Sequence, residues 1–263
     1  MWKPHAQRCD ELISHRNGVG CRALPLRRAR TEAPMAKPTP VFTRETFRFF
    51  KDLSRNNNKT WMDANREQYQ STVVQPFRRL LEALAPVMLE LDSRFDTSGR
   101  TGSSFSRINR DIRFAKDKTP YRTQMYLKFS VPAPGHGETG QLYVGLSRDT
   151  VTTGFRIYSG GKRKESVLAR IGQVRVQAEP AWVAKQKKRL SRRYESYWYT
   201  IEKGEWTKRL GWPVARENWD RILAWIVRRK LSPTAATRAS FPRDLIKVFR
   251  KLYPLLRYTS LPD

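Results

Sequence analysis

Residues 107–122 hold the densest set of groups that could do chemistry, in the order Arg-Ile-Asn-Arg-Asp-Ile-Arg-Phe-Ala-Lys-Asp-Lys-Thr-Pro-Tyr-Arg. Six of these sixteen residues are Arg or Lys and two are Asp, and they alternate with Ile108, Ile112 and Phe114. Arginine binds phosphate or carboxylate through two parallel hydrogen bonds because its guanidinium is planar. The interleaving therefore favours an ordered anion site or a partly buried ionic clamp over a solvated basic block.

The elements around this segment decide which of its charges meet. A helix over residues 106–115 would place four side chains on one face, those of Arg107, Arg110, Asp111 and Phe114. Thr119 precedes a proline, which disfavours helix, so we expect a turn at 117–120 and a strand after it. The candidate anion-binding residues are Arg107, Arg110, Asp111, Arg113, Lys116, Asp117, Lys118, Tyr121 and Arg122.

Two hypotheses for this segment stay open. In the first, cations hold a phosphoryl group, Asp111 orients an arginine, and Asp117 acts as a base or holds a metal; the phosphoryl ligands would be Arg107, Arg110 and Lys118. In the second, the two aspartates neutralise nearby arginines in a clamp that locks helix to sheet. Metal binding is the weakest variant because the surrounding cations oppose it and a third ligand is not evident, and a nuclease-type arrangement is equally poorly supported. We expect no metal and no cofactor.

Charge is the strongest compositional feature. The 263 residues carry 52 Lys and Arg against 24 Asp and Glu, a net charge of +28. Residues 162–263 alone hold 25 basic and 9 acidic residues, a net charge of +16. Such an excess favours a polyanionic partner, either a nucleic acid or a phosphorylated small molecule, although basic residues can also simply coat a surface.

Cysteine and histidine usage excludes several classes of site. Both cysteines, Cys9 and Cys21, precede residue 35, and the only later histidine is His136, in a Gly- and Pro-rich loop. The body of the chain therefore has no disulfide framework, no cysteine nucleophile and no Cys/His zinc site. A catalytic triad would depend on His136, and such loops are more often connections. Residues 1–40 are expected to be a disordered basic extension or to follow a mis-assigned start.

Periodicity predicts one α+β domain over residues 41–260, an antiparallel β-meander packed with several helices. Three helices come first, one capped by Thr43, one capped by Thr60, and one from Pro76 that Pro86 kinks or ends early. Strands are predicted over 125–131, 141–147 and 150–159, followed by helices over 164–173, 182–193, 216–229 and 242–253. No segment has the length of a membrane span, so we expect a cytoplasmic protein without membrane contact.

A second basic cluster lies beside aromatic residues at 194–199. Its candidate nucleic-acid-binding residues are Lys185, Lys187, Lys188, Arg189, Arg192 and Arg193. Cations next to stackable aromatic rings are typical of proteins that bind single-stranded nucleic acid. The competing interpretation is a solvated helix face followed by a core segment anchored by Trp198.

Three motifs resemble an uncharacterised, mainly bacterial family, domain of unknown function 2461. They are the central segment 107–121, the N-terminal stretch Phe50-Lys-Asp-Leu with Asn56, Asn57, Trp61, Tyr69, Pro76 and Phe77, and the C-terminal Phe249-Arg-Lys-Leu-Tyr-Pro-Leu. The resemblance covers about residues 41–259. It implies a single α+β domain and no particular activity, and Asn109 stands where the family is expected to have an aromatic residue, usually Tyr.

The function favoured by the sequence is polyanion binding, most of all nucleic-acid binding through the basic C-terminal half. The alternative is an enzyme or sensor that acts on a small phosphorylated ligand at 107–122. A third possibility is that this segment is only a structural clamp. The residues specify no reaction and no oligomeric state.

Overall fold

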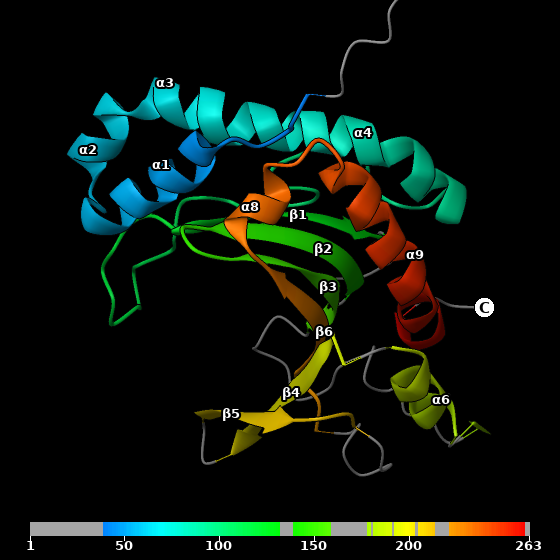
Figure 1. Cartoon of the computed structure of the whole chain (residues 1–263). Coiled ribbons are helices and arrows are strands. Elements are labelled where there is room, and N and C mark those ends of the chain that lie inside the picture. The colour runs from blue at the N-terminus through cyan, green and yellow to red at the C-terminus, as the bar shows by residue number, and fades with distance from the viewer. Residues whose placement is uncertain are drawn as a thin grey trace, which may run out of the picture. The chain divides into compact units, whose positions relative to one another are not determined.

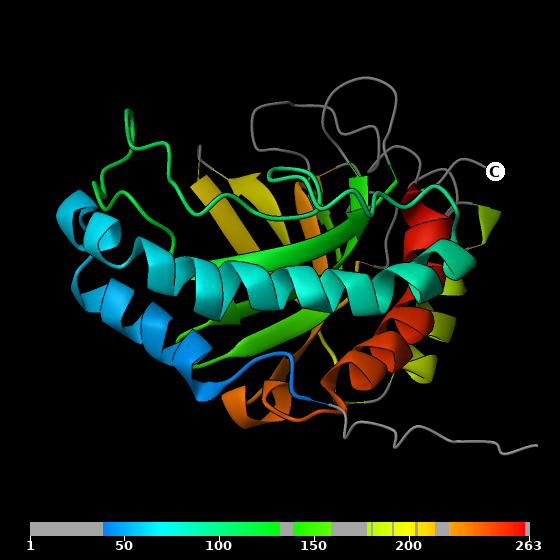
Figure 2. The same cartoon turned by 90° about the horizontal axis from the view of Figure 1, so that it is seen from above.

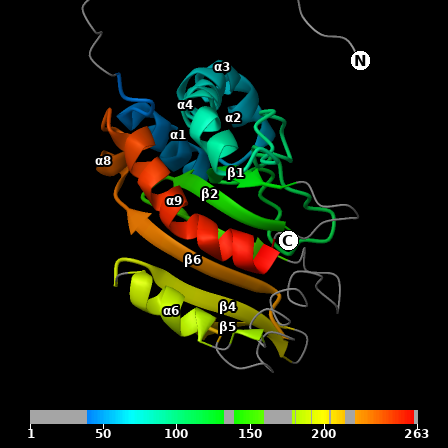
Figure 3. The same cartoon turned by 90° about the vertical axis from the view of Figure 1, so that its right-hand side faces the viewer.

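An antiparallel sheet of six strands carries the fold, with helices packed on one of its faces (Figures 1 and 3). The structure, a computed structural model, describes residues 39–131, 139–158, 178–179, 181–190, 192–202, 205–213 and 221–260. Pro38–Asp263 form one compact unit. The predicted α+β class is confirmed, whereas residues 1–38 of the expected basic extension lie outside the described part of the chain.

The sheet extends well beyond the predicted meander. Its strands are β1 (Gln124–Ser130), β2 (Thr139–Ser147), β3 (Val151–Tyr158), β4 (Glu195–Glu202), β5 (Glu205–Leu210) and β6 (Ala224–Leu231). Their order is β1-β2-β3-β6-β4-β5, and every neighbouring pair is antiparallel. The first three strands confirm the meander, and the β4–β5 hairpin joins the sheet through β6 (Figure 3).

In the sequence, the described helices lie before or after the sheet strands, except for α6, which lies between β3 and β4. They are α1 (Arg44–Arg55), α2 (Lys59–Ala64), α3 (Arg66–Tyr69), the π-helical turn η1 (Gln70–Val74), α4 (Gln75–Leu91), α6 (Trp182–Arg189), α8 (Pro233–Ala236) and α9 (Phe241–Ser260). From α3 to the end of α4 the chain runs as one continuous helical stretch (Figure 2).

Polar side chains fix the start and the π-turn of these first helices. Asn58 caps α2 by accepting a hydrogen bond from a backbone N–H of the first turn at 2.9 Å, so the predicted cap, Thr60, lies inside the helix. Pro76 has no N–H to donate to the carbonyl of Thr72, four residues earlier. The buried hydroxyl of Thr46 donates to that carbonyl at 2.7 Å instead, which ties α1 to η1.

Alternate strand residues point towards the helices and form the core. In β1, Met125, Leu127 and Phe129 are buried, and the residues between them are only partly buried. Helix α9 packs on β2 and β3, α4 on β1, and α1 on β2 (Figures 2 and 3). Phe129 meets Phe249 of α9 edge to face, with 5.8 Å between ring centroids. Among the described residues, no helix packs on the other face of β1, β2 and β3, which we call the helix-free face (Figure 3).

The outer edge of β1 is closed by three residues just before the charged loop. The N–H of Ser106 donates to the carbonyl of Tyr126 at 3.0 Å, and the N–H of Lys128 donates to the carbonyl of Ser104 at 2.9 Å. Phe105, between them, is buried. An exposed edge strand is a template for unwanted pairing, and this contact both removes that risk and fixes the start of the loop.

The predicted helix over 216–229 is wrong, because the described part of that segment contains strand β6, which begins at Ala224. Residues 222–227 form an unbroken apolar run, in which all six side chains are buried. Periodicity cannot separate such a run from a buried helix, whereas its β-branched and aromatic members, Trp225, Ile226 and Val227, favour a central strand. Because β6 was not predicted, its pairing with β4, which joins the β4–β5 hairpin to the sheet, was not predicted either.

Other predicted elements differ mainly in their ends. Helix α4 continues through Pro86 to Leu91, and α6 ends at Arg189. The predicted 242–253 helix is confirmed and extends through Pro254 to Ser260. The helix predicted over 164–173 lies outside the described residues.

Candidate functional site

The charged segment 107–122 is an extended loop. The helix that we considered over residues 106–115 does not form, so that prediction is wrong. Its two ends pair with each other: the N–H of Arg110 donates to the carbonyl of Pro120 at 2.8 Å, and the N–H of Arg122 donates to the carbonyl of Ile108 at 2.7 Å. A bridge between Asn109 and the opposite arm completes the base of the loop. These cross-arm bonds use the backbone groups that a helix would need.

Asn57 anchors the base of this loop to the turn between α1 and α2. Its side-chain amide donates to the carbonyl of Tyr121 at 2.8 Å, and its side-chain oxygen accepts from the N–H of Tyr121 at 3.0 Å. The Tyr121 ring is buried. A single asparagine therefore holds a buried backbone position 64 residues away in the sequence.

Asp117 shapes the loop from within. Its two carboxylate oxygens accept from the N–H of Thr119 at 2.9 Å and from its hydroxyl at 3.0 Å. Arg110 donates to Asp117 at 2.5 Å, and also to the hydroxyl and, at 3.1 Å, the carbonyl of Thr119. The Thr119 N–H and then the Arg110 guanidinium lower the pKa of Asp117 to about 2. A carboxylate with this pKa is a poor general base near neutral pH, which argues against the predicted role of Asp117 as a base.

Three of the other charged residues of the loop tip, residues 111–119, also bond within the loop. Asp111 and Arg113 form a two-bond ion pair, with 3.0 Å and 2.8 Å between nitrogen and oxygen. Lys118 donates to the carbonyl of Ile112 at 3.1 Å. Phe114 is 94% exposed. Most charged side chains of the tip therefore bond to the backbone or to other side chains of the loop itself.

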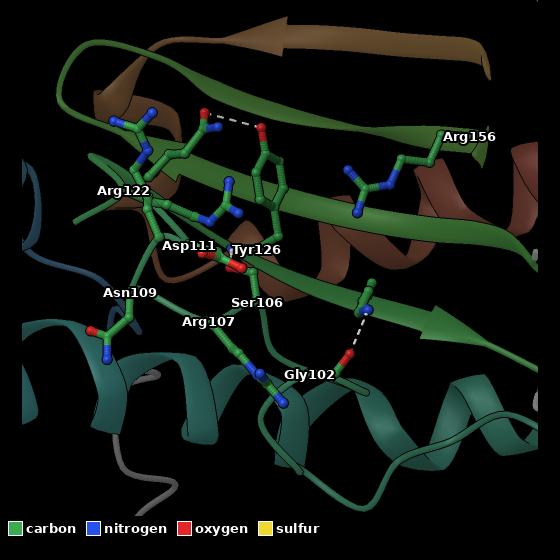
Figure 4. A pocket seen from close by; sticks show the side chains of 11 residues that line it. Gly102, Ser106, Arg107, Asn109, Asp111, Arg122, Tyr126 and Arg156 are labelled. Atoms are coloured by element: carbon green, nitrogen blue, oxygen red, sulfur yellow. Dashed lines mark hydrogen bonds between the residues drawn. The ribbon is translucent and has the colours of Figure 1, made fainter. Parts of the chain in front are cut away.

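A cationic cleft with a volume of about 850 Å³ lies between this loop and the helix-free face of the sheet (Figure 4). Five of its residues are cationic, and only one, Asp111, is acidic. The lining residues are Gly102, Ser106, Arg107, Asn109, Arg110, Asp111, Arg122, Gln124, Tyr126, Lys128 and Arg156. Positive charge therefore converges here from the loop and from two strands.

Lys128 and Arg156 bring charge from the sheet itself. Lys128 donates to the carbonyl of Gly102 at 2.8 Å. Burial lowers the pKa of the Lys128 ammonium, and the charge of Arg156 lowers it further. Arg156 donates to the side chain of Gln141 at 2.8 Å, and its guanidinium lies 5.1 Å from the ring centroid of Tyr126. Both cations thus have polar partners, but no carboxylate among the described residues pairs with either.

Arg107 and Arg122 are the exposed cations of the cleft (Figure 4). Within the described ranges, neither side chain forms an ion pair or a hydrogen bond. The one acidic lining residue, Asp111, is already bonded to Arg113. The two exposed guanidiniums are therefore available to an anion from solution.

Tyr126 covers the sheet beside these cations because its neighbour on β2 is a glycine. A Cβ on Gly145 would lie 2.2 Å from the Tyr126 ring, so no other residue fits beneath it. The ring meets Tyr143 at 5.8 Å between centroids, edge to face. The Tyr126 hydroxyl donates to the side-chain oxygen of Gln124 at 3.1 Å. The cleft thus has an aromatic ring set among its cations.

The structure separates the predicted anion-binding residues into three groups. Those that line the cleft are Arg107, Arg110, Asp111 and Arg122. Asp117 and Tyr121 line a smaller pocket of about 400 Å³, together with Arg110 and Arg122. Arg113, Lys116 and Lys118 line neither.

Sequence reasoning missed Lys128 and Arg156. The alternation of β1 does place Lys128 on the face away from the buried residues. Arg156 reaches the same face only through the pairing of β3 with β2, where it stands opposite Gln141. The sequence signal for Lys128 was therefore present, whereas the one for Arg156 required the strand register.

The second predicted cluster lies on and after α6 and does not line the cleft. Lys185, Lys187 and Lys188 are exposed, as are Arg192 and Arg193. Arg189 donates to the carbonyl of Lys251 at 2.6 Å and to the side chain of Gln186 at 3.0 Å.

Arg189 therefore docks α6 on α9, together with Trp182, which stacks on Tyr258 at 4.0 Å between ring centroids. Trp198 is buried, as the competing interpretation of this cluster predicted.

The described residues contain no group of three His, Cys, Asp or Glu side chains placed to hold a metal ion. In the same part of the chain, no helix combines the length and apolarity needed to cross a bilayer. No curated protein matches the sequence. The family model described as conserved hypothetical protein (DUF2461) matches residues 45–258. This match spans the first helices, the charged loop, the sheet and α9, and the chain therefore belongs to the DUF2461 family.

Proposed function

We propose that this protein binds a phosphate-bearing polyanion, a nucleic acid, and that the cationic cleft is its phosphate site. The observation that carries the proposal is the charge of the cleft: five cationic side chains and one carboxylate, which is already paired with Arg113. Like charges held close together raise each other's free energy, and a bound anion removes that repulsion. The proposal places the protein in the cytoplasm, where such partners are present.

The types of cation support a phosphate ligand. Four of the five are arginines, whose planar guanidinium can hold two phosphate oxygens at once. Lys128 adds a point charge from the floor of the cleft, and its pKa is lowered first by burial and then by the charge of Arg156. A phosphate group bound here would favour the charged form of Lys128. The site therefore gains more from an anion than an isolated surface lysine would.

The charge outside the cleft favours a polymer over a single small anion. The whole chain has a net charge of +28, so a polymer that leaves the cleft meets further cations. Each phosphate neutralised on a nucleic acid releases condensed counterions, which adds to affinity at low salt. A small ligand cannot collect this contribution.

A small phosphorylated molecule is the second candidate, and the size of the cleft favours it. A volume of about 850 Å³ is within the range of sites for small ligands. Neutral polar side chains that could recognise the rest of such a ligand also line the cleft: Ser106, Asn109 and Gln124. In this case the protein would be a sensor or an enzyme for that molecule.

Fluorescence anisotropy with labelled twelve-nucleotide DNA and RNA strands, with inorganic phosphate and nucleoside monophosphates as competitors, tests the two candidates. We expect the strands to bind and millimolar small phosphates to compete weakly. A rise in melting temperature with the small phosphates, together with no binding of the strands, would establish the second candidate instead. If neither strands nor small phosphates bind at 50 mM salt, both are wrong.

A further inference from the structure

The helix-free face of the sheet carries a row of aromatic rings and cations from β1 to β5. Strand pairing places Arg156 of β3 opposite Ile226 of β6, and Ile226 opposite Tyr197 of β4. Paired residues of neighbouring strands lie on the same face. Tyr197, Tyr199 and the residues paired with them on β5 therefore share a face with the cationic cleft.

Ring and cation contacts make this row continuous at its far end. The Tyr197 ring lies between two cations, Arg228 at 4.9 Å and Lys208 at 4.4 Å from its centroid. Tyr197 meets Tyr199 at 5.8 Å between centroids, and Tyr199 meets Trp206 at 5.6 Å. The same ingredients recur at the cleft end, where the guanidinium of Arg156 lies near Tyr126.

The β4–β5 hairpin presents its part of the row to solvent. Trp206 is 38% exposed, Ile201 51% and Leu210 81%. Tyr199 is half-buried, and Lys208 is exposed. Scattered exposed apolar residues are common, but these are neighbours on one face of one hairpin, which marks an interaction surface. Lys208 and Arg228 lie beside these rings, and Arg228 also pairs with Glu195 at 3.2 Å. Together with the cationic cleft on the same face, they favour a partner that combines flat apolar groups with negative charge.

We propose that the ligand is a single-stranded nucleic acid that lies across this face, with its phosphates in the cationic cleft and its bases stacked on Tyr199 and Trp206. This inference rests on the proposed function and specifies its substrate class. Bases of a duplex are already stacked inside it, so only an unpaired strand can offer its bases to exposed rings.

The dimensions of the sheet agree with such a path. From β1 to β5 there are five strand spacings, which amount to about 24 Å at roughly 4.8 Å each. Sites for single strands commonly hold about 4–16 nucleotides. The whole row from β1 to β5 is thus wide enough for one short strand and too wide for one nucleotide.

Affinity for single-stranded and double-stranded oligonucleotides of one sequence tests the inference in the full-length protein. We expect the single strand to bind at least about 10-fold more tightly, and Trp206→Leu and Tyr199→Leu each to weaken it by roughly 10-fold. Trp206→Phe keeps a ring and should keep most of the affinity. Phe114→Leu removes an even more exposed aromatic residue that lies off the sheet face, and should change little. Unchanged melting temperatures show that the variants fold.

The outcomes separate this inference from the proposal beneath it. If both forms bind equally and the Trp206 and Tyr199 variants behave like the wild type, the stacking surface is wrong while the phosphate cleft stands. If Phe114→Leu weakens binding and Trp206→Leu does not, bases stack on the loop and the proposed path is wrong. If neither form binds, the proposed function itself fails.

Discussion

The loop tip and the cationic cleft use the same residue types in opposite ways. In the tip, Asp117 bonds to Thr119 and to Arg110, and Asp111 bonds to Arg113. In the cleft, five cations from the loop and from two strands converge, and among the described residues only Arg110 of these five forms an ion pair with a carboxylate. The two aspartates therefore set the shape of the segment, and we propose that the surplus cations beside them meet the ligand.

The sequence left an ionic clamp and an anion site as alternatives for residues 107–122, and the structure allows both in different places. The clamp exists, but it lies within the loop and between the loop and Asn57, not between a helix and the sheet. The proposed anion site is the cationic cleft, a separate feature whose loop these bonds hold in place. Arg110 belongs to both, because it bonds to Asp117 and also lines the cleft.

Removing the two exposed cations of the cleft, Arg107 and Arg122, should have the largest effect on nucleic-acid affinity. The double variant Arg107→Ser/Arg122→Ser loses two charge-assisted contacts, each contributing about 1.5–3 kcal/mol, so nucleic-acid affinity should fall by at least about 100-fold. Anisotropy titrations measure this loss, and thermal unfolding should show an unchanged melting temperature because neither side chain has a partner in the described structure.

The matched control removes the same charge from the helical layer. Arg48→Ser/Arg66→Ser deletes two arginines that form exposed ion pairs with Glu45 and Asp63. A loss as large as that of the cleft variant would mean that overall charge, and not the cleft, determines affinity.

Arg110→Ala should change both stability and binding. It removes the donor for the Thr119 carbonyl and the partner of Asp117, a loss of about 1–2 kcal/mol in the free energy of unfolding. Affinity should also fall, by less than in the double variant, because one cleft cation is lost. Urea unfolding and anisotropy measure the two effects, and an Arg110→Ala protein of unchanged stability would refute the clamp.

Lys128→Met should weaken binding by roughly 10-fold without lowering stability. The pKa of Lys128 is lowered in the folded protein, so below that pKa the charge disfavours folding, and this unfavourable contribution is relieved as pH rises. Replacing the ammonium with an apolar side chain removes it, and the melting temperature should stay the same or rise. In the wild type, affinity should fall as pH rises through the pKa of Lys128. A lower melting temperature for Lys128→Met would assign the lysine a structural role instead.

Asp117→Asn should have the smallest effect, a change in the free energy of unfolding. The size of this change should depend on pH only in the acid range. The folded-state pKa of about 2 lies below the ordinary value of about 3.9. The stabilisation from the ionised form is therefore complete above pH 4 and is lost as pH falls through 2. The difference in unfolding free energy between the wild type and Asp117→Asn should be constant from pH 7 to about 4 and shrink below it. A constant difference down to pH 2 would contradict the lowered pKa.

The parts of the fold that local signals determine were predictable. The periodic apolar residues of α1, α4 and α9 and the alternation of β1 identified these elements before the structure. Strand β6 was not predictable in this way, because residues 222–227 are apolar on both faces and carry no period. Whether such a run forms a helix or a central strand depends on long-range pairing with β3 and β4.

The candidate site shows the same division. Arg107, Arg110 and Arg122 were identified because they share one short segment. The role of Asn57 as the anchor of that segment, and the arrival of Arg156 from β3, depend on contacts between residues far apart in the chain. The aromatic row across the sheet required the register of six strands, and the sequence did not indicate three of their five pairings.

The dependence of nucleic-acid affinity on salt is the most direct test of the cationic cleft. The slope of log K against log salt counts the ionic contacts with phosphate, and each lost cation should reduce its magnitude by about one. We predict that Arg107→Ser/Arg122→Ser reduces the magnitude by about two and that Arg48→Ser/Arg66→Ser leaves it unchanged. Equal slopes for the wild type and the cleft variant would contradict the account.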